Sequence, residues 1–344
     1  MTDKKTAIIL MTALLPTTGH TDLIEFTQNI PNTDAYVLIN GRSFEPLSGE
    51  TRLRSIKEFF HHSINIKLSM NDAAPQNPED MKNGFWEWWK KEINTNFPNV
   101  KNWDYVVASE IYGKKVAESL DAQFIPYDIE RLNNNTKSTN VRKDLWNEWN
   151  KILPAIRQEL AIKAVMFGQE SVGKTTLSKK VSETLNSRML VEWARPYLET
   201  VGEELSLQKM SNIHHGQASL QHMFFKKAET PSIVLDTDLF STIGYYRIMN
   251  EKEPDELVND AIKLSSDIYY ILPDTIPFVE DILRYGGNER ESTMNFWIEL
   301  LEEFEQNYVI VPDGSVEEKT LWITDDIRQR FGLKTKDLVN FNRE

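Results

Sequence analysis

The sequence contains no cysteine and no excess of basic residues. Each of these absences argues against certain classes of function. Without cysteine there is no disulfide framework, no thiolate zinc site and no cysteine nucleophile. The formal net charge is −13, whereas broad nucleic-acid binding requires clustered lysines and arginines that release counterions from phosphates. We therefore expect no nucleic-acid partner, and any anionic ligand must be held locally.

Long apolar runs and zinc-type histidine pairs are also missing. No run approaches the roughly 18 apolar residues of a membrane helix. Residues 1–5 lead straight into a strand-like segment instead of a signal peptide. The six histidines show no HExxH spacing, which disfavours a zinc hydrolase. We expect a cytoplasmic protein without a membrane partner.

Length and hydrophobic pattern predict two domains of the α/β class. A chain of 344 residues exceeds what one hydrophobic core usually supports. Strands and helices alternate in two series, which predicts parallel strands, crossover helices and doubly wound sheets. Residues 144–160 have helical spacing, and Pro154 should bend or restart that helix. We place the boundary there, which gives predicted domains 1–150 and 151–344.

The expected elements can be given as residue ranges. The predicted strands, the first with a following loop, cover residues 6–15, 35–40, 104–109, 123–127, 162–167, 189–193, 232–236, 267–272 and 308–311. The predicted helices cover residues 21–29, 50–60, 113–120, 174–186, 205–228, 255–264 and 292–306.

Residues 168–175, GQESVGKT, match the phosphate-loop pattern GxxxxGK[ST] at every fixed position. The loop lies between an apolar strand and a helix, so its backbone N–H groups and the helix N-terminus can cradle phosphates. Lys174 is expected to bind the β- and γ-phosphates of ATP, and the Thr175 hydroxyl to bind Mg²⁺. The residues expected to bind ATP are Gly168, Glu170, Ser171, Gly173, Lys174, Thr175 and Thr176.

Acidic residues at the ends of two other strands could complete a kinase site. Asp236 and Asp238 are candidates to hold the magnesium or to act as a base, with Asp236 preferred as the metal ligand. Helix capping is the alternative for both. Glu192 and Arg195 lie where a substrate is expected, with Glu192 as a possible general base. A helix cap or a surface ion pair is the alternative there.

The segment 281–290 combines two glycines with Arg284 and Arg290. Such a segment is typical of a lid that closes arginines over a transferring phosphoryl group in a small-molecule kinase. A solvated loop is the alternative.

Two short motifs in the N-terminal half point to a second nucleotide site. Thr17, Gly19 and His20 resemble the [HT]xGH signature of nucleotidyltransferases, in which the glycine admits the phosphates and the histidine donates to the α-phosphate. Thr139 and Arg142 resemble the ISxTxxR signature, which grips the β- and γ-phosphates, although Lys137 stands where the serine is expected. These motifs indicate a Rossmann-like nucleotidyltransferase domain before the P-loop kinase domain.

Over nearly its whole length the chain resembles the bifunctional NadR-type proteins, which join a nicotinamide-nucleotide adenylyltransferase to a ribosylnicotinamide kinase. The stretches that carry the resemblance are 41–52, 107–113, Asp128 with Arg131, 139–157, 168–177, Glu192 with Arg195, 235–238 with Thr242, and Asp281 with Arg284. Some members begin with a DNA-binding helix-turn-helix. Since the first strand here begins at about residue 6, we expect the form without it.

The resemblance implies both reactions of NAD salvage. Nicotinamide riboside would be phosphorylated to nicotinamide mononucleotide (NMN), and AMP from ATP would be transferred to NMN, both with Mg²⁺. It also implies that Trp86, Trp88 and Trp89 in the first half help build the nicotinamide pocket, with Trp88 foremost. In the second half, Trp193 with Arg195 would contact the nicotinamide substrate. The tryptophans around Trp88, which also include Trp86 and Trp89, have the helical spacing of core residues as an alternative.

Two departures from the family pattern keep other functions open. Thr17 replaces the more common first histidine, and Ala13-Leu14-Leu15 stands where a basic or aromatic residue is frequent, which could weaken adenylyl transfer. The alternatives are therefore an active kinase with a structural first half, or a nucleotide or NAD sensor. The oligomeric state, a homo-oligomer included, stays open.

Overall fold

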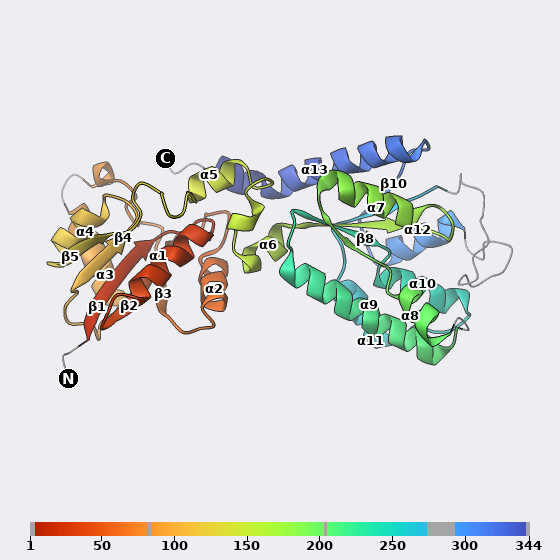
Figure 1. Cartoon of the computed structure of the whole chain (residues 1–344), viewed down its shortest axis with the longest axis horizontal. Helices are drawn as coiled ribbons and strands as arrows, with labels where there is room; N and C mark the ends of the chain where they lie inside the picture. Colours follow the sequence, from red (N-terminus) through yellow and green to blue (C-terminus); the bar gives the residue numbers. More distant parts are fainter. Residues whose placement is uncertain (1–3, 82–83, 203–204, 274–292, 342–344) are drawn as a thin grey trace. The chain divides into compact units, whose positions relative to one another are not determined.

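The computed structural model describes residues 4–81, 84–202, 205–273 and 293–341, which form two compact units. The first comprises the described parts of 1–157 and 335–344, and the second comprises those of 158–334. Each unit is built around a five-stranded parallel sheet with helices on both faces (Figure 1). This confirms the predicted α/β class with two doubly wound sheets. Within the described residues, no helix is both long and apolar enough to span a membrane.

The sheet of the first unit has the strand order β3-β2-β1-β4-β5. Its strands are β1 (Lys5–Met11), β2 (Thr33–Gly41), β3 (Asn65–Met70), β4 (Tyr105–Ala108) and β5 (Gln123–Pro126). Its helices are α1 (Thr18–Gln28), α2 (Gly49–Phe59), α3 (Phe85–Asn96), α4 (Gly113–Ser119), α5 (Ser138–Lys143) and α6 (Pro154–Leu160), with short 3₁₀ turns at Pro78–Asp80 and Trp149–Lys151. The order reverses between β1 and β4, and ligands of open α/β sheets bind at such a switch point.

Alternating side chains on the central strand build two separate cores. Ile9 packs with Leu23 and Ile56 of α1 and α2, whereas Ile8 packs with Ile93 and Val116 of α3 and α4. Successive strand residues point to opposite faces. Since both faces are covered, the central strand β1 is apolar without interruption over residues 7–11.

The sheet of the second unit has the strand order β10-β9-β6-β8-β7. Its strands are β6 (Ile162–Phe167), β7 (Arg188–Leu190), β8 (Ser232–Asp236), β9 (Ile268–Ile271) and β10 (Tyr308–Ile310). Its helices are α7 (Lys174–Leu185), α8 (Ala194–Val201), α9 (Leu207–Lys227), α10 (Leu239–Ile248), α11 (Asp255–Lys263), α12 (Met294–Glu303) and α13 (Val316–Asn340). The P-loop connects the central strand β6 to α7, beside the acidic end of β8.

The division between the units differs from the predicted domains at two places. It falls after residue 157 instead of 150, because Ile152 bridges to Thr17 and the Leu153 N–H donates to the Pro16 carbonyl at 3.1 Å. The end of α13 groups with the first unit, where Arg142 donates to the Phe341 carbonyl. These contacts join residues far apart in sequence, which a local pattern does not register.

Several elements differ from the sequence-based expectations. Residues 144–160 do not form one helix, since a 3₁₀ turn precedes α6 and Pro154 is the first residue of α6, where its missing N–H costs least. Six of the described helices and strands lie outside the predicted ranges, namely β3, α3, α5, α8, α10 and α13.

Candidate active sites

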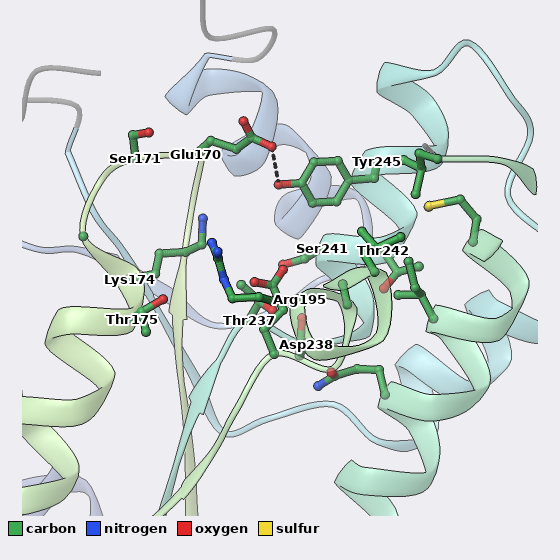
Figure 2. Close-up of a pocket in the computed structure, with 18 of the residues that line it drawn as sticks. Glu170, Ser171, Lys174, Thr175, Arg195, Thr237, Asp238, Ser241, Thr242 and Tyr245 are labelled. Carbon is green, nitrogen blue, oxygen red and sulfur yellow. Dashed lines mark hydrogen bonds between the residues drawn. The ribbon is translucent and has the colours of Figure 1, made fainter. Parts of the chain in front are cut away.

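The P-loop of the second unit has the backbone conformation that its glycines permit. Gly168 and Gly173 have φ values of +124° and +89°, in the left-handed region that favours glycine. The Lys174 ammonium donates to the carbonyls of Gly168 (3.0 Å) and Gln169 (2.7 Å), so the lysine lies along its own loop. Figure 2 shows Lys174, Thr175 and Arg195 around the same space. The loop, the lysine and the helix N-terminus can together hold phosphate groups.

Asp236, at the end of β8, has the features of a ligand for a divalent cation. Its side chain is 3% exposed, and the Thr175 hydroxyl donates to it. Its Oδ1 atom is buried without a hydrogen-bond partner among the described residues. Burial raises the pKa of Asp236, while the Thr175 hydrogen bond and the positive charges of Lys174 and Arg195 oppose that rise.

The oxygen atoms at this position fit Mg²⁺. The described residues contain no group of three histidines or acids that could enclose a metal. Mg²⁺ seldom needs one, because it is usually bound through one or two protein oxygens together with substrate phosphates and water. Thr175 and Asp236, the pair expected to bind the metal, would therefore be a sufficient protein contribution.

Asp238 has a different environment two residues later. Its Oδ1 accepts from the Phe240 N–H (3.0 Å) at the start of α10, and its Oδ2 accepts from the Tyr269 hydroxyl (2.6 Å). Burial raises its pKa to about 7, against the effect of these hydrogen bonds. Since both oxygens are occupied, this geometry favours the capping alternative for Asp238.

Glu192, between β7 and α8, and Arg195, in the first turn of α8, line the cavity beside the P-loop. Burial, followed by the negative charge of Asp236, raises the pKa of Glu192 to about 6, against the opposing effect of Lys174 and Arg195. A carboxylate with a pKa near neutrality is well matched to accept a proton. Glu192 therefore stays a candidate for the general base of this cavity.

The cavity, of about 230 Å³, has an apolar part formed by helices α8, α9 and α10 and by Leu205 just before α9. The residues of this part are Leu198, Leu205, Met210, Ile213 and Tyr245. The Tyr245 hydroxyl donates to Glu170 of the P-loop at 3.1 Å, which joins α10 to the loop (Figure 2). Tyr245 and Gln217 also line the cavity. Neither was identified from the sequence, because neither belongs to a recognisable motif.

Trp193 does not line this cavity. Its indole lies against α9, where a Cβ atom on Gly216 would come within 1.8 Å of its Nε1. The glycine therefore makes room for the ring. The predicted lid arginines, Arg284 and Arg290, lie outside the described residues.

The second site is a cavity of about 670 Å³ in the first unit. The five residues that the two N-terminal motifs predicted to bind ATP all line it, namely Thr17, Gly19, His20, Thr139 and Arg142. The cavity volume is within the usual range for small-molecule sites. The fold thus brings together two motifs that are far apart in the sequence.

The start of α1 fixes the protonation of the His20 ring. The backbone N–H of Thr17 donates to Nδ1 of His20 at 3.1 Å, and the Thr17 hydroxyl lies 2.9 Å from the same atom. In a neutral imidazole, an accepting Nδ1 leaves the proton on Nε2. His20 can therefore offer Nε2–H as a hydrogen-bond donor to an anion.

The aromatic lining of this cavity comes from α3. Phe85, Trp86 and Trp89 line it, whereas Trp88 packs with its ring edge-to-face on Trp89, at 4.8 Å between centroids. All three tryptophans were expected to build the nicotinamide pocket, with Trp88 foremost, and the structure places Trp86 and Trp89 in the lining but not Trp88. The helical spacing alone did not show which tryptophans contact the substrate and which pack in the core. The orientation of α3 on the sheet decides this.

Arg142 and Asn40 add two features to the same cavity. The Nη1 of Arg142 donates to the carbonyls of Leu338 (3.3 Å) and Phe341 (2.6 Å) at the end of α13. Asn40, at the end of β2, is 2% exposed, and both polar atoms of its amide lack a partner among the described residues. No sequence motif pointed to Asn40.

The comparisons with known proteins agree with this arrangement. Residues 163–319 match a family described as an AAA domain. The trifunctional NAD biosynthesis/regulator proteins NadR of Salmonella typhimurium and Escherichia coli are 23% and 24% identical over 290 residues, covering 82% of this chain and 70% of each relative. The chain is related to the NadR proteins. The sequence-based resemblance is thereby confirmed.

Two solved structures of a NadR protein share the fold. One, in complex with NR, superposes with a TM-score of 0.64 at 20% identity and covers 99% of this chain and all of that one. The other, in complex with NAD and AMP-PNP, has a TM-score of 0.64 at 21% identity, covering 99% and 98%. The likeness extends over both units, so each unit shares the fold of the corresponding part of NadR.

Proposed function

We propose that this protein makes NAD from nicotinamide riboside in two steps, one at each cavity. The second unit would phosphorylate the riboside to NMN, and the first would transfer AMP from ATP to NMN with release of pyrophosphate. The observation that carries the proposal is that each unit has one cavity lined by a nucleotide-binding motif, in a chain related to NAD biosynthesis proteins. The NR, NAD and AMP-PNP bound by the structural neighbours are ligands of the same chemistry.

In the phosphorylation step, the P-loop and Lys174 would hold the β- and γ-phosphates. The 5′-hydroxyl oxygen of the riboside attacks the γ-phosphorus, the bond from that phosphorus to the bridging oxygen breaks, and ADP leaves. Glu192 accepts the hydroxyl proton, for which its pKa of about 6 is suited. Mg²⁺, held by Thr175 and Asp236, would neutralise charge on the phosphates. The apolar wall of α8 and α9 would exclude water from the riboside.

In the adenylyl transfer step, a phosphate oxygen of NMN attacks the α-phosphorus of ATP, and pyrophosphate leaves. His20 donates from Nε2–H to the α-phosphate as charge develops there. The Thr139 hydroxyl and the Arg142 guanidinium would hold the departing β- and γ-phosphates. Gly19 leaves room at the N-terminus of α1, where backbone N–H groups favour an anion.

The test is to incubate the purified protein with ATP, Mg²⁺ and either nicotinamide riboside or NMN, and to identify the products by mass spectrometry. We expect NMN in the first reaction, followed by NAD, and NAD with pyrophosphate in the second. Phosphorylation of the riboside without NAD from NMN would leave a kinase with a structural or sensing first unit. Binding of both nucleotides without any product would leave a sensor.

Two variants assign each reaction to its cavity. His20→Ala should lower NAD formation from NMN by about 100-fold or more and leave phosphorylation unchanged. Lys174→Ala should do the reverse. His222→Ala and Lys179→Ala, at exposed positions of the second unit, are the matched controls. Equal loss of both activities in either site variant would contradict the assignment of one reaction to each cavity.

A further inference from the structure

The Glu192 side chain depends on its backbone for its place in the cavity beside the P-loop. Strand β7 ends at Leu190 and α8 begins at Ala194, so Glu192 lies in the short connection between them and lines the cavity. Among the described residues its carboxylate makes no hydrogen bond, although the charges of Lys174 and Arg195 act on it. The orientation of this carboxylate must therefore be set by whatever holds the connection.

Gln217 of α9 holds the peptide bond that follows Glu192. Its Oε1 atom accepts from the Trp193 backbone N–H at 3.0 Å, and this N–H belongs to the peptide between Glu192 and Trp193. Gln217 is 3% exposed and lies within α9, a helix of 21 residues. A buried side chain on a long helix holds a neighbouring segment more firmly than a loop can.

A chain of buried amides sets the direction of this hydrogen bond. The Leu264 carbonyl after α11 can only accept, so Gln221 directs its Nε2 group there, at 3.1 Å. The Gln221 Oε1 atom then faces Nε2 of Gln217 at 3.4 Å, which leaves the Gln217 oxygen for the Trp193 N–H. Buried amides are costly unless they are paired. Both glutamines are therefore placed to support the connection before α8.

Gly216, the neighbour of Gln217, holds the ring of the same tryptophan. A Cβ atom on Gly216 would lie 1.8 Å from Nε1 and 2.3 Å from Cδ1 of Trp193, so only glycine lets the indole approach the helix this closely. Neither Gly216 nor Trp193 is among the described residues that line the cavity. Two successive residues of α9 thus fix the ring and the backbone of Trp193, which is the N-cap residue of α8.

We propose that Gly216 and Gln217 are positioning residues of the kinase site, which fix Trp193 and thereby hold Glu192 toward the riboside hydroxyl. The inference rests on the proposed phosphorylation of nicotinamide riboside, in which Glu192 accepts the proton. A general base must lie within hydrogen-bond reach of the proton that it takes, and a misplacement of about 1 Å can cost about 100-fold in rate. Trp193 then acts through its place in the fold and not through contact with the pyridine ring.

Initial rates of riboside phosphorylation by the full chain test the proposal. Gln217→Met keeps the size of the side chain but removes the acceptor, and we expect kcat to fall by about 10- to 100-fold while KM for ATP stays within about twofold. Gly216→Ala, which displaces the indole, should lower kcat in the same way, although alanine favours a helix.

Two matched controls carry the same substitutions at places remote from Trp193. Gln208→Met is at an exposed position of α9, and Gly332→Ala is on α13, where an added Cβ meets no other atom within 4 Å. Both should keep the wild-type kcat. A higher KM for the riboside with an unchanged kcat in the Gln217 and Gly216 variants would indicate direct substrate contact and would overturn the proposal.

A double variant shows whether Gln217 acts through Glu192. Glu192→Gln alone should lower kcat by about 100-fold or more. The addition of Gln217→Met should then lower kcat by no more than about twofold further, because residues that act as a unit are not additive. If the two single effects multiplied in the double variant, Gln217 would act independently of Glu192. That result would overturn the proposal, and so would an unchanged kcat in Glu192→Gln.

Hydrogen–deuterium exchange separates this inference from the proposed function. In Gln217→Met, exchange of the amides at 191–195 should rise by about 5- to 10-fold, because the hydrogen bond that protects the Trp193 N–H is lost. Gln208→Met should leave this exchange unchanged. A wild-type protein that phosphorylates no riboside would contradict the proposed function, whereas unchanged exchange in Gln217→Met would show that Gln217 does not hold the connection.

Discussion

Asp236 and Asp238 show how two acids of the same motif acquire different properties. Both are almost fully buried, at 3% and 2% exposed, and burial raises the pKa of each. Asp238 has a backbone N–H and a tyrosine hydroxyl on its two oxygens, whereas one oxygen of Asp236 has no partner among the described residues. We infer that Asp238, which lines the cavity, holds the start of α10, and we propose Asp236 as the ligand of the metal ion.

The isosteric variants of these two acids separate the roles. We expect Asp236→Asn to lower kcat for riboside phosphorylation by about 100-fold or more, because it removes negative charge from the proposed metal ligand. Asp238→Asn should retain phosphorylation while it lowers the free energy of unfolding by about 1–3 kcal/mol, through poorer pairing of buried groups. Initial rates and urea unfolding measure the two effects. A folded Asp238→Asn protein as inactive as Asp236→Asn would contradict this division.

At the scale of elements, an arginine network joins α10 to α12. Arg247 donates to both oxygens of Glu303, at 2.6 and 2.9 Å, and to Glu253 at 2.7 Å. These hydrogen bonds lower the pKa of both glutamates and raise that of Arg247. Glu303 is half exposed, so solvent screens its ion pair with Arg247. The ion pair with the better buried Glu253 therefore contributes more to stability.

The lowered pKa values predict a pH dependence of stability. A carboxylate whose pKa is lowered by folding stabilises the protein above its unfolded value, about 4.3 for glutamate, and loses that contribution as the pH falls through the folded value. Arg247→Met should therefore cost about 1–2 kcal/mol at pH 7. The difference from wild type should stay constant down to about pH 5 and shrink below about pH 4. Urea unfolding of both proteins from pH 7 to 3 measures it, and a difference that grows in acid would contradict it.

The Arg142 side chain links the end of α13 to the N-terminal cavity. Arg142 of α5 lines that cavity and donates to the Leu338 and Phe341 carbonyls. The last carbonyls of a helix have no intrahelical partner and carry partial negative charge, so a cation there is favourable. The same guanidinium can thus orient toward a phosphate and cap a helix.

Removal of Arg142 should be detectable at that helix end. We expect Arg142→Ala to increase hydrogen–deuterium exchange of the amides at 336–341 by about 5- to 10-fold, because a helix-end hydrogen bond of about 1 kcal/mol is lost. NAD formation from NMN should fall in the same variant, and riboside phosphorylation should not. Lys143→Ala, the exposed neighbour on α5, is the matched control. If hydrogen–deuterium exchange at 336–341 were unchanged in Arg142→Ala, the hydrogen bonds from Arg142 to the Leu338 and Phe341 carbonyls would not stabilise this helix end.

At the scale of the whole molecule, each unit has its own parallel sheet and hydrophobic core. Domains of this kind fold around their own cores, so a side-chain change in one site should leave the other intact. In the proposed sequence the intermediate, NMN, is a stable small molecule. The two reactions can then be supplied by two different copies of the chain.

A mixing experiment tests this independence. His20→Ala alone should convert nicotinamide riboside only to NMN, and Lys174→Ala alone should leave the riboside unchanged. An equimolar mixture should form NAD after a lag in which NMN accumulates. Chromatography of the reaction over time measures all three compounds. A mixture that makes NMN but no NAD would show that NMN must pass between the two sites of one chain.

The features that the sequence predicted well are local ones. The P-loop at 168–175 is one contiguous stretch, and its glycines, lysine and threonine are recognisable because the phosphate cradle is made by neighbouring backbone groups. The buried strands β1, β2, β6, β8 and β9 were predicted for the same reason, since a short apolar run bounded by turns is itself the signal. β3, with buried and exposed residues mixed in NIKLSM, gives no such run and was missed.

Long-range contacts decided what the sequence left open. Thr17 and Thr139 share a cavity only because β1 and the segment after β5 end at the same edge of the sheet. Whether Trp86, Trp88 or Trp89 lines that cavity depends on the rotation of α3.

The sequence by itself determined the α/β class, the nucleotide-binding motifs and the NadR-type resemblance. Only the tertiary structure distinguished Asp236 from Asp238 and singled out Asn40, because the missing or present hydrogen-bond partner of a buried side chain comes from residues that are distant along the chain.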